Sequence, residues 1–163
     1  TYYLEMREQE LFLPKAAPEH LRISLVDPPQ PKLNRELYET VGKRWQWVDR
    51  LVWSNEDWQR YVLRQVVETW VGRVEGEIAG YFELEAQKDG DVEIAFFGLL
   101  EEFIGQGLGG PLLSRAIERA WEWPETRRVW VHSCTKDHEH ALGNYLKRGF
   151  QVYKTEESSA GGL

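Results

Sequence analysis

The 163-residue sequence predicts a mixed α/β fold, in which helices flank a central and mostly antiparallel sheet. Three observations lead to this fold class. Strand-like segments separated by tight-turn residues occupy the middle of the chain, as in an antiparallel meander. A cluster of glycines follows, and apolar residues at helical spacing come directly after it. Helix-like and strand-like segments then alternate, which indicates that further strands join the same sheet.

The segment ahead of the meander predicts a strand and a helix. Residues 21–26 (LRISLV) suit a strand, and residues 27–31 (DPPQP) suit a stiff connector. Asn34 is the expected N-cap of the first helix, which runs to about Lys43.

A second helix has a clearer start. Ser54 is the expected N-cap, and Asp57 stands three residues later, where it completes a capping box. Trp53 and Trp58 occupy the two positions of a hydrophobic staple around this cap.

The meander itself predicts three strands joined by two tight turns. Glu75-Gly76 and Asp89-Gly90 are residue pairs typical of short hairpin turns. The expected strands cover residues 68–74, 77–85 and 91–100.

The segment beyond the glycine cluster predicts two helices and two strands. Apolar residues at helical spacing over 112–121 indicate the first helix, and residues 128–134 suit a strand. A short helix is expected over about 139–148, with Gly149 as a left-handed stop. Residues 150–155 suit a closing strand.

Composition and charge exclude several classes of function. The net charge is −7, so nonspecific attraction to nucleic acid or an anionic membrane is not expected. No apolar run approaches the roughly 18 residues of a membrane-spanning helix, and the acidic first ten residues lack the apolar region of a signal peptide. The single cysteine, Cys134, fits a cytoplasmic location. We expect one domain over residues 1–157 and a frayed tail over 158–163.

The glycine cluster lies in FIGQGLGGPLL, residues 103–113. Glycine amides at the start of a helix are unobstructed by side chains, and the helix dipole favours negative charge there. Pro111 suits the first helical position. The cluster therefore predicts a phosphate or pyrophosphate site, and the alternative is a flexible loop that merely tolerates glycine.

Two common nucleotide motifs fit this cluster poorly. Gly105, Gly107 and Gly110 satisfy G-x-G-x-x-G, but the next strand ends without the acidic residue that binds a ribose. A Walker A loop requires Gly-Lys followed by Ser or Thr, which is missing here. A nucleotide-dependent oxidoreductase is therefore disfavoured.

The segment Ile104-Gly105-Gln106-Gly107-Leu108-Gly109 resembles the Gln/Arg-x-x-Gly-x-Gly/Ala turn of the GNAT acyl-CoA N-acyltransferases, with Ile104 at the usual Gln or Arg position. A downstream segment resembles the family's Asn, Ala, Tyr and Gly-Phe pattern. Its residues here are His138 (in place of Asn), Ala141, Tyr145 and Gly149-Phe150. The order of the expected elements over residues 21–155 agrees with the family.

The resemblance implies a GNAT fold that binds acetyl-CoA where two neighbouring strands of the sheet splay apart. The backbone of Phe97, Gly98 and Leu99 would contact the pantetheine and the thioester. The remaining cofactor-binding residues would be Gly105, Gln106, Gly107, Leu108, Gly109, Gly110 and His138. Gly98 independently suggests a bulge or a close approach by a backbone or ligand, or else a simple kink of the sheet.

The implied reaction is direct transfer of an acetyl group to a primary amine in a ternary complex. The amine has a pKa near ~10.4, so its neutral form costs about 4.6 kcal/mol at pH 7, and a carboxylate is needed to take the proton. Glu93 is the candidate base, because the family's histone-acetylating branch has a catalytic Glu at this place; otherwise it is a solvent-facing strand residue. Glu83 and Glu85 are the fallback bases.

Tyr145 is the candidate acid for the leaving thiolate, because a phenol of pKa ~10 stays protonated at pH 7. Its helical position also suits a core tyrosine. Trp45 and Trp47 lie in the region that covers the acceptor site in the family, where aromatic walls would receive a small-molecule or peptide amine.

No metal site is expected, because His138 and His140 point in different directions on a helix. The eight tryptophans leave a homodimer open. The alternative function is a non-catalytic acyl-CoA-binding module of the same fold.

Overall fold

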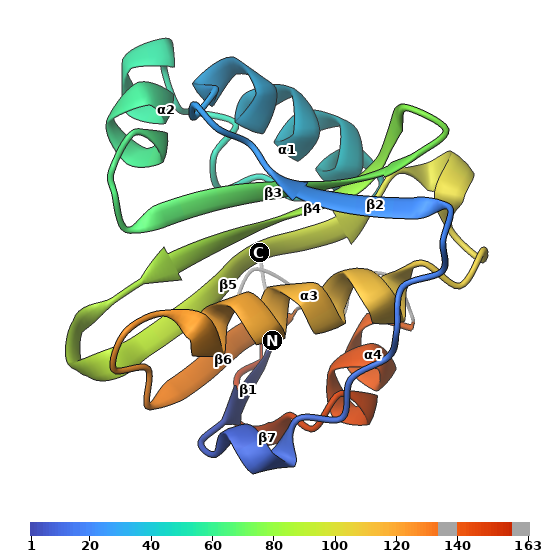
Figure 1. The fold of residues 1–163 in the computed structure, drawn as a ribbon. Helices are drawn as coiled ribbons and strands as arrows, with labels where there is room; N and C mark the ends of the chain where they lie inside the picture. Colours follow the sequence, from blue (N-terminus) through green and yellow to red (C-terminus); the bar gives the residue numbers. More distant parts are fainter. Residues whose placement is uncertain (134–139, 158–163) are drawn as a thin grey trace.

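The computed structural model describes residues 1–133 and 140–157, which form a seven-stranded sheet flanked by helices (Figure 1). The strand order is β2-β3-β4-β5-β6-β1-β7. The strands are β1 (Tyr2–Met6), β2 (Leu21–Leu25), β3 (Val67–Val74), β4 (Glu77–Ala86), β5 (Asp91–Leu99), β6 (Arg128–Ser133) and β7 (Gln151–Thr155). The α-helices are α1 (Pro31–Trp45), α2 (Asn55–Val62), α3 (Gly109–Glu122) and α4 (Ala141–Lys147).

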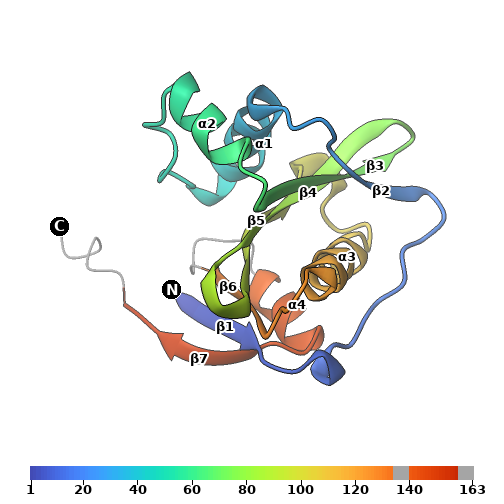
Figure 2. The same ribbon diagram turned by 60° about the vertical axis from the view of Figure 1, so that its left-hand side comes forward.

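The sheet is mostly antiparallel, which confirms the predicted fold class. β3, β4 and β5 form the expected meander, and only β5 and β6 run parallel among the paired strands that the structure describes. The pairs α1/α2 and α3/α4 cover opposite faces of the sheet (Figure 2). The largest apolar cluster packs α3 against the sheet, and smaller clusters lie under α1 and α2.

β5 and β6 pair over only three residues each. The parallel register joins Asp91–Glu93 to Arg128–Trp130 and ends there, although β5 continues to Leu99 against β4. Just beyond this point, the register between β4 and β5 shifts, because Ala95 is an extra residue on β5 with no partner on β4. The sheet therefore opens beyond Glu93, and one edge of the opening is the second half of β5.

The start of α2 has the predicted cap. The Asp57 amide donates to Ser54 Oγ at 3.1 Å, and the Ser54 amide donates to Asp57 Oδ2 at 2.9 Å. The Trp53 and Trp58 rings lie 4.9 Å apart between centroids, as a hydrophobic staple requires.

The prediction that Asn34 caps α1 is wrong. The helix begins at Pro31, whose fixed φ suits the first helical position, so Asn34 lies within the helix and is fully buried. The side-chain Nδ2 of Asn34 donates to Thr69 Oγ1 at 2.6 Å and to Glu83 Oε2 at 3.1 Å. Pro111 is likewise the third residue of α3 and not the first, because Gly109 and Gly110 are already helical.

β1 has no counterpart among the predicted elements. It pairs with β6 on one side and β7 on the other, and so it extends the sheet beyond the opening. Residues 158–163, predicted to fray, lie outside the described residues. Within the described part of the chain, no helix is long and apolar enough to span a bilayer.

Candidate functional site

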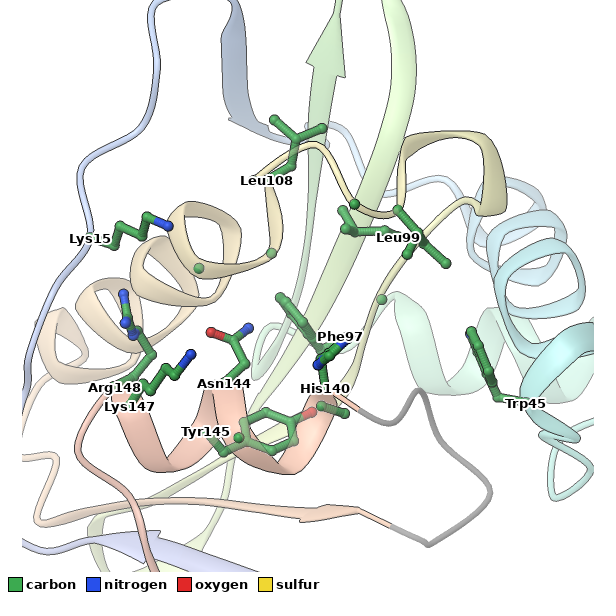
Figure 3. A pocket seen from close by; sticks show the side chains of 18 of the residues that line it. Lys15, Trp45, Phe97, Leu99, Leu108, His140, Asn144, Tyr145, Lys147 and Arg148 are labelled. Carbon is green, nitrogen blue, oxygen red and sulfur yellow. The ribbon is translucent and has the colours of Figure 1, made fainter.

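A cleft of about 480 Å³ lies between the second half of β5, the glycine-rich loop and α4 (Figure 3). The end of α1 and the N-terminal segment complete its walls. Many of the residues predicted to bind the cofactor, the acceptor or the leaving group line it. They are Trp45, Trp47, Phe97, Gly98, Leu99, Gly105, Gly107, Leu108, Gly109, Gly110 and Tyr145.

The glycine-rich loop depends on two left-handed residues. Gly105 has φ +85° and Gly107 has φ +78°, a region that residues with a Cβ rarely adopt. A Cβ added at either position would meet no atom within 4 Å. Glycine is therefore required here for the path of the backbone and not for space.

The amides of this loop are available to a ligand. Among the described residues, no group accepts a hydrogen bond from a backbone amide of residues 105–110. The loop ends on the first turn of α3, so successive N–H groups stand at the positive end of a helix dipole. This arrangement is a cradle for an anion such as a phosphate.

Gln106 differs from its neighbours in the loop. Its side chain is exposed and donates to the Glu102 carbonyl at 3.0 Å, and it is absent from the lining of the cleft. His138, which was also predicted to bind the cofactor, lies outside the described residues.

Gly98 allows α1 to approach β5 closely. A Cβ at this position would lie 2.5 Å from Val41 Cγ1 and 3.5 Å from the Trp47 ring. The neighbour that approaches is a helix side chain and not a second backbone. Phe97 and Leu99, the residues on either side, line the cleft from the opposite face of β5 and pack toward α3.

Tyr145 is buried in α4, at 5% exposure, and its ring packs between Phe97 and Phe150. The phenol lies at the wall of the cleft beside Phe97 (Figure 3). The ring therefore belongs to the core and the residue also lines the cleft, while the role of Tyr145 as an acid stays a prediction.

Glu93 lies on the other face of the sheet. Val92 and Ile94 point into the core under α3, so the side chain between them points to the face that α1 and α2 partly cover. The carboxylate is 12% exposed, accepts from Gln87 Nε2 at 2.9 Å, and lies 3.3 Å from His132 Nδ1. Glu93 is also the last residue of β5 that pairs with β6, so it stands where the sheet opens.

The two fallback carboxylates are engaged elsewhere. Glu83 is 1% exposed and forms a buried ion pair with Arg50, with Nη2 and Oε1 2.8 Å apart. Glu85 faces Glu93 across the hairpin and pairs with Arg64. Neither residue lines the cleft, and Glu93 does not line it either; Glu93 differs from them by its place where the sheet opens.

Trp45 and Trp47 form the aromatic end of the cleft. Trp45 lies under the Arg44 guanidinium, 5.1 Å from the ring centre. Trp47 also lines the cleft, and its ring packs against Tyr38 and Phe96.

Six lining residues were absent from the sequence prediction: Lys15, His140, Gly143, Asn144, Lys147 and Arg148. Asn144, Lys147 and Arg148 recur at the i, i+3, i+4 spacing that places residues on one helical face. That spacing was the available signal for them. Lys15 reaches the cleft from a segment about 90 residues earlier than the glycine-rich loop, and no local pattern marks it. Among the described residues, no group of three or more His, Cys, Asp or Glu side chains is arranged to hold a metal.

An opened mixed sheet beside a cleft, with an amide cradle at the start of α3, defines the architecture of the N-acyltransferases. The sequence matches the model of the acetyltransferase (GNAT) family over residues 32–150. The chain therefore belongs to the GNAT acetyltransferase family. Among curated proteins, none matches the sequence significantly.

Solved structures share the fold at low identity. A GCN5-related N-acetyltransferase from Kribbella flavida has a TM-score of 0.68 at 17% identity and covers 93% of this chain, which spans only 53% of that protein. A Bacillus subtilis acetyltransferase in complex with CoA has a TM-score of 0.61 at 23% identity, over 82% and 78% of the two chains. An aminoglycoside acetyltransferase from an uncultured soil metagenomic sample, in complex with sisomicin, has a TM-score of 0.65 at 16% identity, over 85% and 96%.

Proposed function

We propose that this protein is an acetyl-CoA-dependent N-acetyltransferase that acts on a primary amine by direct transfer in a ternary complex. One observation carries the proposal: the backbone amides of residues 105–110 have no acceptor among the described residues, and most of these residues line an open cleft along β5. Family membership and the CoA-bound structural relative support the choice of a CoA thioester.

The residues present fit this co-substrate. The amides of residues 105–110 would hold the pyrophosphate, and the unpaired edge of Phe97–Leu99 would hold the pantetheine. Bound acetyl-CoA supplies the acetyl group as a thioester. The apolar walls of the cleft, including Phe97, Leu99 and Leu108, exclude water from that part of the site.

Glu93 and Tyr145 stand on opposite faces of the sheet beside its opening. Glu93 takes one proton from the acceptor ammonium, directly or through a water molecule, and the neutral amine forms the C–N bond while the C–S bond breaks. Tyr145 donates a proton to the sulfur that leaves, and the second proton of the amine restores the phenol. An acceptor that approaches from the α1/α2 face therefore meets a donor on the α3/α4 face. Direct transfer needs this arrangement, because both substrates must be bound together.

His132 contacts Glu93, the proposed base. Its Nδ1 lies 3.3 Å from Glu93 Oε2, and its side chain is 41% exposed, so it connects the carboxylate to solvent. We assign it the role of holding Glu93 in place and passing the proton outward.

The acceptor is a small-molecule or peptide amine that reaches Trp45 and Trp47. The structural relative with bound sisomicin, an aminoglycoside, supports a small cationic amine, because aromatic rings attract cations. The alternative is a non-catalytic acyl-CoA-binding module.

The experiment is a screen of amines, amino acids, aminoglycosides and peptides, in which each compound is incubated with acetyl-CoA and the release of free CoA is measured. The double variant Glu93→Gln, Tyr145→Phe is measured in parallel, together with CoA binding by calorimetry. An enzyme shows turnover with some acceptor and loses it in the double variant while binding of CoA persists. Binding of CoA without turnover across the panel favours the module, and failure to bind CoA refutes both.

A further inference from the structure

The cleft carries different chemistry at its two ends. Trp45 lines one end, and the cationic side chains of Lys15, Lys147 and Arg148 line the other (Figure 3). The amide cradle lies between the ends. This concentration of cations is unexpected in a chain of net charge −7.

Lys15 is held at this end by the N-terminal segment, which makes two hydrogen bonds to α3 and to the end of α4 and one close backbone approach to Gly149. Its backbone amide donates to Ser114 Oγ at 2.8 Å, and Ser114 is buried in α3. The Leu13 amide donates to the Arg148 carbonyl at 3.0 Å, and the Leu11 carbonyl lies 2.1 Å from where a Cβ of Gly149 would stand. The segment thus crosses both α3 and the end of α4.

Lys15 and Arg148 meet beside Gly110. A Cβ added to Gly110 would lie 2.8 Å from Lys15 Cδ and 3.4 Å from Arg148 Nη1. Arg148 Nε is buried and has no hydrogen-bond partner among the described residues. Within the same described residues, none of Lys15, Lys147 and Arg148 forms an ion pair with an acidic side chain.

We propose that Lys15 and Arg148, with Lys147 beside them, form a subsite for a phosphomonoester, the 3′-phosphate on the ribose of the coenzyme. This inference rests on the proposed function. The order of groups along the cleft matches the order along a CoA thioester: the acyl end beside Phe97, the pyrophosphate at residues 105–110, and the nucleotide beyond Gly110. A phosphomonoester carries about −1.5 to −2 charges at pH 7 and accepts several charge-assisted hydrogen bonds.

The subsite makes the protein select CoA over 3′-dephospho-CoA. The amide cradle contacts the part that the two coenzymes share, whereas the cations contact the phosphate that only CoA has. The N-terminal segment therefore acts as a specificity element for the donor, although it lies far from the glycine-rich loop in the sequence.

The test is calorimetric titration of the wild type and the variants Lys15→Ala, Lys15→Gln and Arg148→Gln with CoA and with 3′-dephospho-CoA. The wild type should bind CoA at least about tenfold more tightly than dephospho-CoA, since each tenfold corresponds to about 1.4 kcal/mol. Each variant should lose about tenfold in affinity for CoA and keep its affinity for dephospho-CoA. Lys32→Ala, an exposed lysine at the start of α1, is the matched control and should change neither.

The outcomes separate the two proposals. Equal affinity of the wild type for both coenzymes, or a parallel loss for both in the variants, overturns the subsite and leaves the proposed function intact. Failure to bind either coenzyme overturns the proposed function and the subsite with it. Adenosine 3′,5′-bisphosphate gives an independent check, because it differs from 5′-AMP by the 3′-phosphate alone and should compete with CoA more strongly than 5′-AMP in the wild type and equally in Lys15→Ala. Thermal unfolding of each variant confirms that the fold is retained.

Discussion

The Arg50 guanidinium and the Glu83 carboxylate form an ion pair that is almost sealed from solvent, with Nη2 and Oε1 2.8 Å apart and side-chain exposures of 8% and 1%. The guanidinium also lies 4.2 Å from the Tyr61 ring centre and 4.4 Å from that of Phe96. Burial by itself lowers the pKa of Arg50, but the charge and hydrogen bonds of Glu83 outweigh it and raise the pKa. This pair ties the loop after α1 to the middle of β4.

Removing one partner of this pair should be costly. Glu83→Gln leaves a buried guanidinium without its counter-charge, so we expect a loss of about 3–5 kcal/mol in the free energy of unfolding by urea titration. Arg60→Ala, which breaks an exposed pair on α2, is the control and should change stability far less. A Glu83→Gln protein with wild-type stability would contradict a structural role for this carboxylate.

Glu93→Gln should affect turnover and not folding. With an acceptor from the amine screen, we expect kcat at pH 7 to fall by about 10²–10⁴-fold, because the ammonium of the acceptor loses its base. The fall should shrink as pH rises, since the amine then deprotonates without help. Glu85→Gln, on the neighbouring strand, is the matched control and should retain kcat. Unchanged kcat in Glu93→Gln would remove this residue from the mechanism.

Gly107→Ala should weaken binding of CoA. The left-handed conformation at this position costs a residue with a Cβ about 1–2 kcal/mol, so the loop relaxes and its amides diverge. We expect roughly tenfold weaker binding in a calorimetric titration. The control is Gly143→Ala, which also adds a methyl group to the wall of the cleft but lies in α4 without a positive φ. Equal losses in both variants would show that crowding, and not backbone conformation, is responsible.

The ion pair between Glu68 and Arg119 should make stability depend on acid pH. Burial raises the pKa of Glu68, but hydrogen bonds from Arg119 and Trp70 outweigh it and hold the pKa below its usual 4.5. A carboxyl whose pKa is lowered by folding stabilises the protein above its unfolded pKa and loses this effect as pH falls through the folded pKa. Stability should therefore decline below pH 4.5.

Urea unfolding of Glu68→Gln between pH 3 and 6, a range chosen to span roughly the carboxyl titration, should show a shallower decline than the wild type. Arg119→Met removes the same contribution through the other partner and should flatten the curve as well. A wild-type slope in both variants would refute the assignment.

Local rules predicted much of the fold. The capping box at Ser54, the staple of Trp53 and Trp58, and the meander all depend on residues close in sequence, and the structure has them. The same rules failed at Asn34, because a residue that suits a cap also suits a buried position when a partner such as Thr69 is supplied from another strand.

In the candidate site, too, some features depend on residues close in sequence and others depend on tertiary packing. By itself, the sequence determined the glycine-rich turn and the presence of a helix after it, although not the first residue of that helix, because backbone conformation is set by neighbouring residues. Only the tertiary structure decided that β1 lies between β6 and β7, that Glu83 is committed to Arg50, and that Lys15 reaches the cleft beside Arg148. These relationships join residues far apart in the chain, and they depend on packing geometry that no local pattern specifies.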